Sequence, residues 1–303
     1  MEQNKPFLSI IVPTFNRRDK LADCLESLSH LDYPQGRVEV VVVDDGSQVT
    51  PESVVSRFLD RLDVTLLTQA HAGPAAARNN GATKARGEFL VFTDDDCSPA
   101  PDWLQKLSAR FFDFPDHAIG GRTINGLPSN LYSVASQAII DVVYAYYNTN
   151  PNQTCFFASN NLAMPADRFH AIGGFDVTFM TSEDRELCDR WRHYGFQMTY
   201  APEVLVYHAH ALTFYAFWQR YFNYGRGAFR FHQAVAKRGS GCFRVDHKFY
   251  LNLFRYPFSQ EQGQRVLLFT VLLVMSQIAN AMGFFGEWLR QPIKKNSYKP
   301  LVC

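Results

Sequence analysis

The sequence predicts an α/β fold, with a mostly parallel central sheet, flanking helices and a helical C-terminal extension. Short apolar runs rich in valine and isoleucine alternate with helix-like segments over the first hundred residues. Acidic and other polar residues follow directly after several of these runs. From about residue 214 the chain becomes rich in aromatic residues and arginine, with no strand-like run. Alternating strands and helices need crossover connections, and such connections produce parallel sheets.

The composition limits the class of protein. The chain has 303 residues and a formal net charge of +1. That length allows one large domain or two ordinary ones, and the charge argues against binding nucleic acid by bulk electrostatics. No signal peptide is expected at the N-terminus. Six scattered cysteines without a CxxC pair predict reduced thiols in a cytoplasmic chain, with no disulfide framework or zinc site: Cys24, Cys97, Cys155, Cys188, Cys242 and Cys303.

Four strands and three helices are expected in the first hundred residues. The strands are apolar on both faces, as in a sheet that is covered on both sides. The helices have apolar residues on one face or are rich in alanine. We expect strands at residues 8–13, 38–45, 64–69 and 88–94, and helices at residues 19–31, 51–62 and 73–85.

Polar residues follow three of these strands. Asn16 and Arg17 come after the first strand, residues 44–47 after the second and residues 94–96 after the fourth. Ligands of parallel sheets gather at the carboxyl ends of the strands. The simplest interpretation is one site supplied by three strand ends.

The run Asp94-Asp95-Asp96 is the strongest of these signals. Adjacent like charges repel, and no basic residue lies beside them in the sequence. A Mg²⁺ or Mn²⁺ ion bridging to a diphosphate needs one or two carboxylates and would relieve the repulsion. The alternative is a solvated turn or a helix cap. A second acidic strand end lies at residues 44–47. There Asp45 either accepts hydrogen bonds from a base or ribose, or serves only in an Asp-Gly turn with Gly46.

Later segments add a candidate base and a candidate metal ligand. A helix is expected at residues 181–191, and its first turn holds Glu183 and Asp184, which either serve as a general base or only complement the helix dipole. His208 lies after a strand-like run, and it either joins the metal or is structural. Arg78 either pairs with phosphates or the base, or is a surface arginine.

Taken together, the motifs resemble a known family. SIIVPTFNR, VVVDDGS, ARNNGATKARGEFLVFTDDD, GGFD, SEDRELCDRW and VYHAH occur in this order over residues 7–211. The set resembles family 2 glycosyltransferases with the GT-A fold, a Rossmann-like nucleotide-diphospho-sugar transferase fold. The resemblance implies an inverting enzyme that moves one sugar from a nucleotide-diphosphate sugar, most often a UDP-sugar, to a hydroxyl group. It also implies Mg²⁺ or Mn²⁺ and an acceptor that is a glycan or lipid-linked, in cell-envelope glycan, polysaccharide or glycolipid synthesis.

The resemblance also implies roles for individual residues. Asp184 matches the catalytic base, and Asp96 and His208 match the metal ligands. The donor nucleotide would be bound by Pro13, Thr14, Phe15, Asn16, Asp45, Arg78, Asp94 and Asp95. The donor sugar and acceptor would be lined by Asn160, Asn161, Gly174, Phe175, Asp176 and Glu183.

One departure from the family bears on processivity. The processive synthases carry a QxxRW motif, whereas residues 216–230 hold Trp218, Gln219 and Arg220 in another order. We therefore expect transfer of a single sugar. Among rival functions, a nucleotidyltransferase would need a glycine-rich loop after the first strand, and a dinucleotide-binding domain would need GxGxxG. A pseudoenzyme that binds nucleotide sugar without turnover is the non-enzymatic alternative, and the intact Asp96 and Asp184 argue against it.

We expect a catalytic domain at residues 1–215 and a helical extension at residues 216–303. Residues 266–286 carry no charge and are long enough to span a bilayer, but basic residues flank both ends and give no orientation. Three placements are open. The helix packs on the catalytic domain or on a second copy in a homodimer, lies in a membrane interface, or spans the membrane. The expected location is the cytoplasm, with peripheral contact at the inner face of the plasma membrane, and no nucleic-acid partner is expected.

Overall fold

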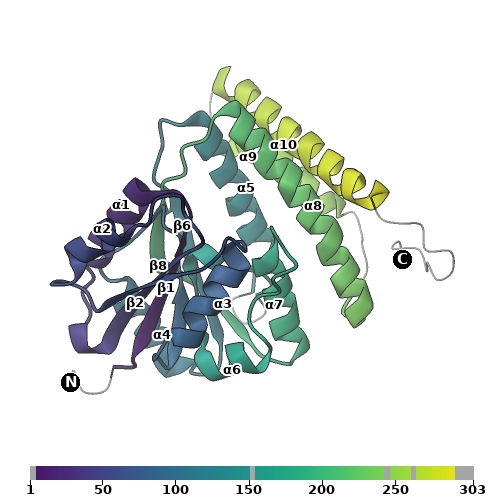
Figure 1. The fold of residues 1–303 in the computed structure, drawn as a ribbon. Coiled ribbons are helices and arrows are strands. Elements are labelled where there is room, and N and C mark those ends of the chain that lie inside the picture. Colours follow the sequence, from purple (N-terminus) through teal and green to yellow (C-terminus); the bar gives the residue numbers. More distant parts are fainter. Residues whose placement is uncertain (1–4, 151–153, 242–245, 261–263, 291–303) are drawn as a thin grey trace.

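The structure is a computed structural model that describes residues 5–150, 154–241, 246–260 and 264–290. One eight-stranded sheet forms its centre, with helices on both faces (Figure 1). The strand order is β3-β2-β1-β4-β7-β6-β8-β5. The strands are β1 (Leu8–Thr14), β2 (Val38–Asp44), β3 (Val64–Thr68), β4 (Phe89–Phe92), β5 (Cys97–Pro99), β6 (Ala118–Asn125), β7 (Leu162–Pro165) and β8 (Met198–His208).

The apolar strands bury both of their faces. Ile10 and Val12 of β1 pack in one core layer, whereas Ile11 between them packs in the other. This alternation follows from the period of two along a strand. The first layer lies under α1 (Arg18–Leu28) and α4 (Trp103–Asp113), and the second lies under α3 (Pro74–Lys84), α6 (Ala166–Ala171) and α7 (Glu183–His193).

The four expected strands are present, the sheet is mixed, and one expected helix needs correction. The sheet is parallel from β3 to β4 and between β6 and β8, whereas β7 pairs antiparallel with β4 and β6, and β5 pairs antiparallel with β8. The helix expected at 51–62 is a short α2 (Glu52–Val55) followed by a 3-10 turn, Ser56–Phe58. The β-branched pair Val54-Val55 has low helix propensity, which disfavours a longer helix there. Of the cysteines expected to be reduced, Cys242 and Cys303 lie outside the described residues, and Cys24, Cys97 and Cys188 are free thiols.

The C-terminal part is helical, as expected. It contains α8 (Phe214–Arg238), α9 (His247–Gln260) and α10 (Gln264–Leu289), which pack with α5 (Leu131–Tyr147) beside the sheet (Figure 1). Two glycines let α8 and α10 approach to backbone contact. A Cβ atom on Gly225 would lie 1.9 Å from the carbonyl oxygen of Asn280, and one on Gly283 would lie 1.9 Å from that of Phe222.

The extension also packs on the segment that begins α7. The Thr181 hydroxyl donates a hydrogen bond to the carbonyl of Asn223 in α8, at 2.9 Å. A Cβ atom on Gly227 would lie 2.6 Å from the carbonyl oxygen of Thr181. Arg230 donates to the carbonyl of Thr178 at 3.0 Å. Helix α8 therefore fixes the turn from which the first residues of α7 project.

The glycine contact between α8 and α10 generates a stability prediction. Gly225→Ala places a methyl group on the backbone of α10, so we expect it to lower the free energy of unfolding by about 1–3 kcal/mol. Gly286→Ala is the matched control in α10, because nothing lies within 4 Å of its Cβ position. The control should be neutral or raise stability by about 0.5–1 kcal/mol, since alanine favours helix. Urea unfolding followed by circular dichroism measures both, and equal effects would contradict the close contact.

Candidate active site

The three consecutive carboxylates each lie beside an arginine or a histidine in the structure. Asp94 pairs with Arg78 at 2.7 Å, Asp95 pairs with Arg17 at 2.7 Å, and Asp96 lies 3.0 Å from Nε2 of His208. These partners come from α3, from the segment after β1 and from the end of β8. The repulsion that the sequence suggested a metal would relieve is therefore already offset by side chains distant in sequence.

Arg78 is the buried centre of this arrangement, with 4 % of its surface exposed. Its guanidinium group donates to Asp94 at 2.7 Å and to Glu183 at 2.9 Å, and lies 5.5 Å from the centre of the Phe175 ring. Burial alone would lower the pKa of Arg78, but Asp94 and Glu183 outweigh it and raise that pKa. Arg78 thus joins the end of β4 to the first turn of α7.

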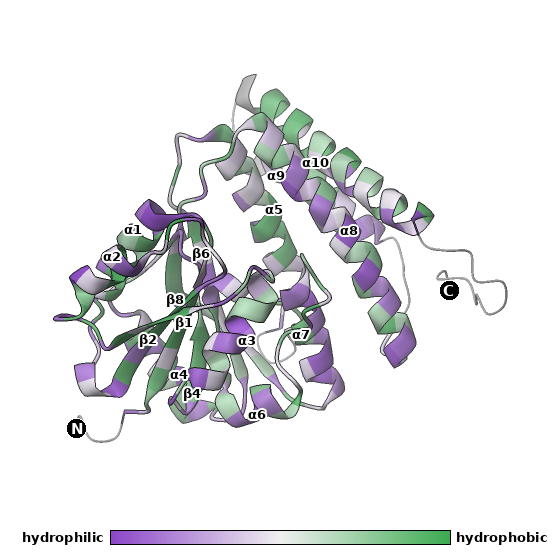
Figure 2. Ribbon diagram, in the orientation of Figure 1, coloured by the Kyte–Doolittle hydropathy of each residue, from purple (hydrophilic) through white to green (hydrophobic). Residues whose placement is uncertain are grey.

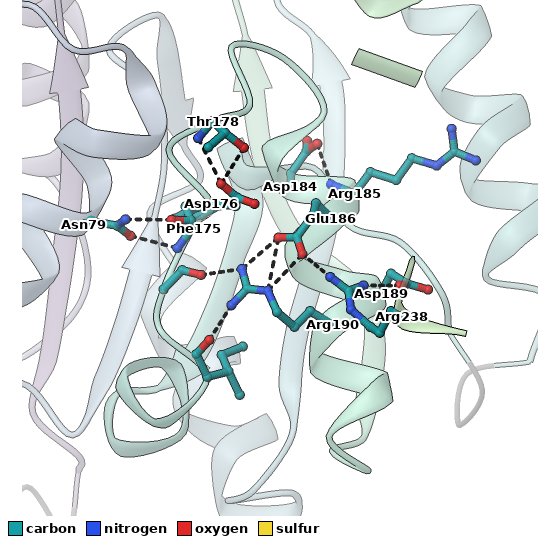
Figure 3. Close-up of polar contacts among 12 residues, drawn as sticks. Asn79, Phe175, Asp176, Thr178, Asp184, Arg185, Glu186, Asp189, Arg190 and Arg238 are labelled. Atoms are coloured by element: carbon teal, nitrogen blue, oxygen red, sulfur yellow. Dashed lines mark hydrogen bonds and ion pairs between the residues drawn. The ribbon is translucent and has the colours of Figure 1, made fainter. Parts of the chain in front are cut away.

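Asp184, the expected base, is the member of the acidic pair without a cation. Its carboxylate accepts a hydrogen bond from the backbone N–H of Arg185 at 2.7 Å, as Figure 3 shows, and no ion pair to it occurs among the described residues. Burial, followed by repulsion from Glu183, raises the pKa of Asp184 to about 7. A carboxylate that titrates near neutral pH suits a general base.

Asp96 and His208 form the candidate metal site. Ligand atoms of Asp96, Cys97 and His208 all lie within 4.8 Å of one another. Burial, helped by Asp94 and Asp96, raises the pKa of the Cys97 thiol, so this group stays protonated and is a poor ligand. The remaining oxygen and nitrogen donors, 3.0 Å apart, fit a hard divalent cation that also binds phosphates.

Two histidines, His208 and His210, lie side by side at the end of β8. The Nδ1 atoms of His208 and His210 are 3.1 Å apart. Burial, and then the neighbouring His208, lowers the pKa of His210 to about 3, so His210 is neutral at pH 7. The amide nitrogen of Asn160 lies 3.4 Å from Nδ1 of His208. These neighbours orient the His208 ring with Nε2 toward Asp96.

An aromatic surface lies beside the expected nucleotide site. Phe15, 37 % exposed, stacks on His71 with ring centres 4.1 Å apart and an interplanar angle of 23°. Asn16, which follows Phe15, has a positive φ of 56° and accepts a hydrogen bond from the backbone of Gln48. A flat exposed ring pair of this kind can stack on a nucleobase.

Asp45, predicted to contact the base or ribose, has four partners within the protein. Its carboxylate accepts from the backbone N–H groups of Ala72 and Gly73 at 2.8 Å and from Gln69 at 2.7 Å. His71 lies 2.9 Å away on the remaining side. These four partners use the carboxylate's lone pairs. Asp45 therefore holds the segment that carries His71.

Four more predicted contact residues are buried in the fold. Pro13 lies within β1, and Asp95 accepts a hydrogen bond from the Thr14 hydroxyl at 2.7 Å besides its pair with Arg17. Asn161 accepts from Trp103 Nε1 and donates to the carbonyl of Val204, both at 2.9 Å. The polar side chains among them therefore have partners within the fold, and their contact with substrate stays a prediction.

The GGFD segment lies against α3 next to Arg78. The side chain of Asn79 exchanges two hydrogen bonds with the backbone of Phe175, each 2.8 Å long (Figure 3). Gly174 has φ +67°, and a Cβ atom there would lie 2.5 Å from the Asn79 oxygen. Asp176 accepts from the backbone and hydroxyl of Thr178. The segment is therefore held by its own turn and by Asn79.

Three residues with roles in this geometry are absent from the predicted set: Arg17, His71 and Asn79. Arg17 belongs to the polar run after β1, which is a signal that could have identified it. His71 and Asn79 lie in the 69–80 segment, where nothing in the local sequence indicates their partners. Of the predicted residues, Asp94, Glu183 and Phe175 lie around Arg78, and His208 with Asn160 lies beside Asp96.

Comparison with known proteins identifies the family. A family model described as Glycosyl transferase family 2 matches residues 9–181. Glycosyltransferase AglE of Haloferax volcanii is 26% identical over 230 residues, which cover 75% of this chain and 74% of AglE. The pre-mycofactocin glycosyltransferase of Mycobacterium tuberculosis is 30% identical over 210 residues, covering 67% of this chain but 43% of that relative.

Solved structures of similar fold support the same assignment. Mannosyltransferase PcManGT from Pyrobaculum calidifontis superposes with a TM-score of 0.66 at 19% identity, over 96% of this chain and 89% of that one. Residues 1–349 of TarS from S. aureus give a TM-score of 0.55 at 17% identity, over 92% and 89% of the two chains. The fold expected from the motifs is confirmed. The chain is a GT-A glycosyltransferase and belongs to glycosyl transferase family 2.

Proposed function

We propose that this protein transfers one sugar, with inversion, from a nucleotide-diphosphate sugar to a hydroxyl group of a glycan or lipid-linked acceptor. The observation that carries the proposal is the position of Arg78. It ties Asp94, beside the candidate metal ligand Asp96, to Glu183, beside the candidate base Asp184. The buried Arg78 side chain thereby fixes the candidate leaving-group site and the candidate base relative to each other.

The chemistry follows from these residues. The Asp184 carboxylate takes the proton of the acceptor hydroxyl as its oxygen attacks the anomeric carbon. The new C–O bond forms while the bond from that carbon to the diphosphate oxygen breaks. The sugar inverts, the nucleoside diphosphate leaves, and the proton remains on Asp184 until solvent removes it. This is general-base catalysis by a group with a pKa matched to neutral pH.

Asp96 and His208 are the residues that would hold Mg²⁺ or Mn²⁺. When bound, such an ion neutralises charge that develops on the leaving diphosphate. Arg17, which touches Asp96 at 3.2 Å and Asp95 at 2.7 Å, keeps the carboxylates compensated and is itself 49% exposed. It can therefore reorient as a phosphate approaches Asp96.

Membership of the family supports the proposed donor class and setting. One similar structure is a complex of PcManGT with GDP-Man and Mn²⁺, and another is a complex of TarS with UDP-GlcNAc. They support a nucleotide-sugar donor, and the family resemblance implies a UDP-sugar. We place the reaction in the cytoplasm, where nucleotide sugars are available, and in the synthesis of an envelope glycan, polysaccharide or glycolipid.

Asp96 provides the first test. We expect release of nucleoside diphosphate from one of a panel of UDP-, GDP- and dTDP-sugars, with Mg²⁺ or Mn²⁺ and not with EDTA. Asp96→Ala should lower that release about 100-fold or more, and should weaken Mn²⁺ binding in the presence of the diphosphate, followed by electron paramagnetic resonance. Asp102→Ala is the matched control, because within the part of the chain that the structure describes Asp102 has one ion pair, with Lys106 at the surface. Donor binding without any release would favour the pseudoenzyme.

Asp184 provides the second test. Asp184→Asn should keep nucleotide binding within about threefold while turnover falls about 10²–10⁴-fold. Because only the deprotonated form is a base, kcat/KM of the wild type should fall as pH drops below about 7 and level off above pH 8. The pH dependence should disappear in Asp184→Asn. Asp113→Asn, a change at the exposed end of α4, should retain it, and loss of the profile there would count against Asp184.

A further inference from the structure

Helix α10 presents an apolar stripe to the outside of the molecule. The stripe consists of six residues that are 39–71% exposed: Leu267, Val271, Val274, Ile278, Met282 and Phe285. Their spacing of three or four residues places them within an arc of about 80°, over a length of about 27 Å. Trp288 and Leu289, 53% and 75% exposed, extend the apolar surface to the end of the helix. Figure 2 shows α10 as predominantly hydrophobic along its length.

Ser276 and Glu287 of α10 lie on the opposite side. Ser276 is fully buried, and Glu287 is buried against Arg226 and Arg230 of α8 at 2.8 and 2.7 Å. Gly283 also faces α8 at backbone contact. In a helix that faces water the polar residues would be outside. Here the arrangement is reversed, and between Leu267 and Leu289 every exposed residue is apolar.

The charge of the chain is unevenly distributed. Residues 214–303 hold 13 Lys and Arg against 3 Asp and Glu, a formal net charge of +10, whereas the whole chain has +1. Residues 1–213 therefore carry −9. Helix α9 shows the same pattern locally, because Lys248, Leu251, Arg255 and Phe258 are exposed at helical spacing. Basic residues interleaved with exposed apolar ones are typical of helices that lie on anionic membranes.

We propose that the apolar stripe of α10 docks on the surface of an anionic lipid bilayer, with the exposed basic residues of the extension contacting the headgroups. A second copy is a poorer occupant, because two extensions of charge +10 would be brought together. A spanning helix is also a poorer account. It would have to leave α8, separate Glu287 from its two arginines, and expose Ser276 to lipid.

Vesicle flotation of the full-length chain tests the docking surface. We expect binding to vesicles of phosphatidylcholine with phosphatidylglycerol at low salt. Binding should be at least about tenfold weaker at high salt or with phosphatidylcholine alone. The double variant Ile278→Glu, Met282→Glu should reduce binding by about tenfold or more. Both positions are about half exposed, so the fold should tolerate the change.

The control variant carries the same added charge elsewhere. Leu59→Glu with Val177→Glu changes two exposed apolar residues of the catalytic part, and vesicle binding should be unchanged. Three results would overturn the proposal. The wild type could fail to bind anionic vesicles. Its vesicle binding could resist alkaline carbonate, as that of a spanning helix does. It could also form a dimer without lipid, and the stripe variant could dissociate that dimer. Nucleoside diphosphate release is measured without vesicles, so failure here is distinguishable from failure of the proposed transferase activity.

Discussion

The site depends on the need to neutralise three adjacent carboxylates at the end of β4. Isolated charges are costly to bury, and two of these three side chains are nearly inaccessible. The fold meets the need by bringing Arg17 from the end of β1, Arg78 from α3 and His208 from the end of β8 to the same place. Two strand pairings make this possible. β1 lies next to β4, and β5, which directly follows the acidic run, pairs with β8. The strand order therefore makes the acidic run compatible with a folded chain.

This constraint also explains which parts were predictable from sequence. The ends of the strands could be predicted because apolar runs stop at polar residues, and the ordered motifs indicated the family. The ion-pair partners of the carboxylates could not be predicted. Arg78 and Asp94 are 16 residues apart, but Arg78 and Glu183 are separated by 105. Local sequence patterns do not indicate such pairs. From the sequence, a metal ion was therefore the expected source of charge compensation for Asp94, Asp95 and Asp96, which the fold also compensates with its own side chains.

The same reasoning applies to predicted contact residues whose side chains have partners within the fold. Asp45, Asp95 and Asn161 belong to matching motifs, and motif matching cannot separate a group that touches substrate from one that holds the loop beneath it. Their hydrogen bonds to backbone and to buried side chains separate the two cases. The mixed half of the sheet was also missed, because β5 and β7 have three and four residues and show no alternation that could set their direction.

The helical extension packs on the helix that carries Asp184, and its positive charge has two uses. Arg238 at the end of α8 pairs with Glu186 and Asp189 of α7, and Figure 3 shows this link below Asp184. Basic residues of the extension thus bind it to acidic residues of α7 and help position the helix that carries Asp184. Cations that make no such pair, as on the exposed face of α9, stay available to another anionic surface. Because α10 is locked to α8 by glycine contacts and by Glu287, a surface bound at the stripe is held at a fixed position relative to α7. An acceptor anchored in that surface would meet Asp184 by motion in two dimensions.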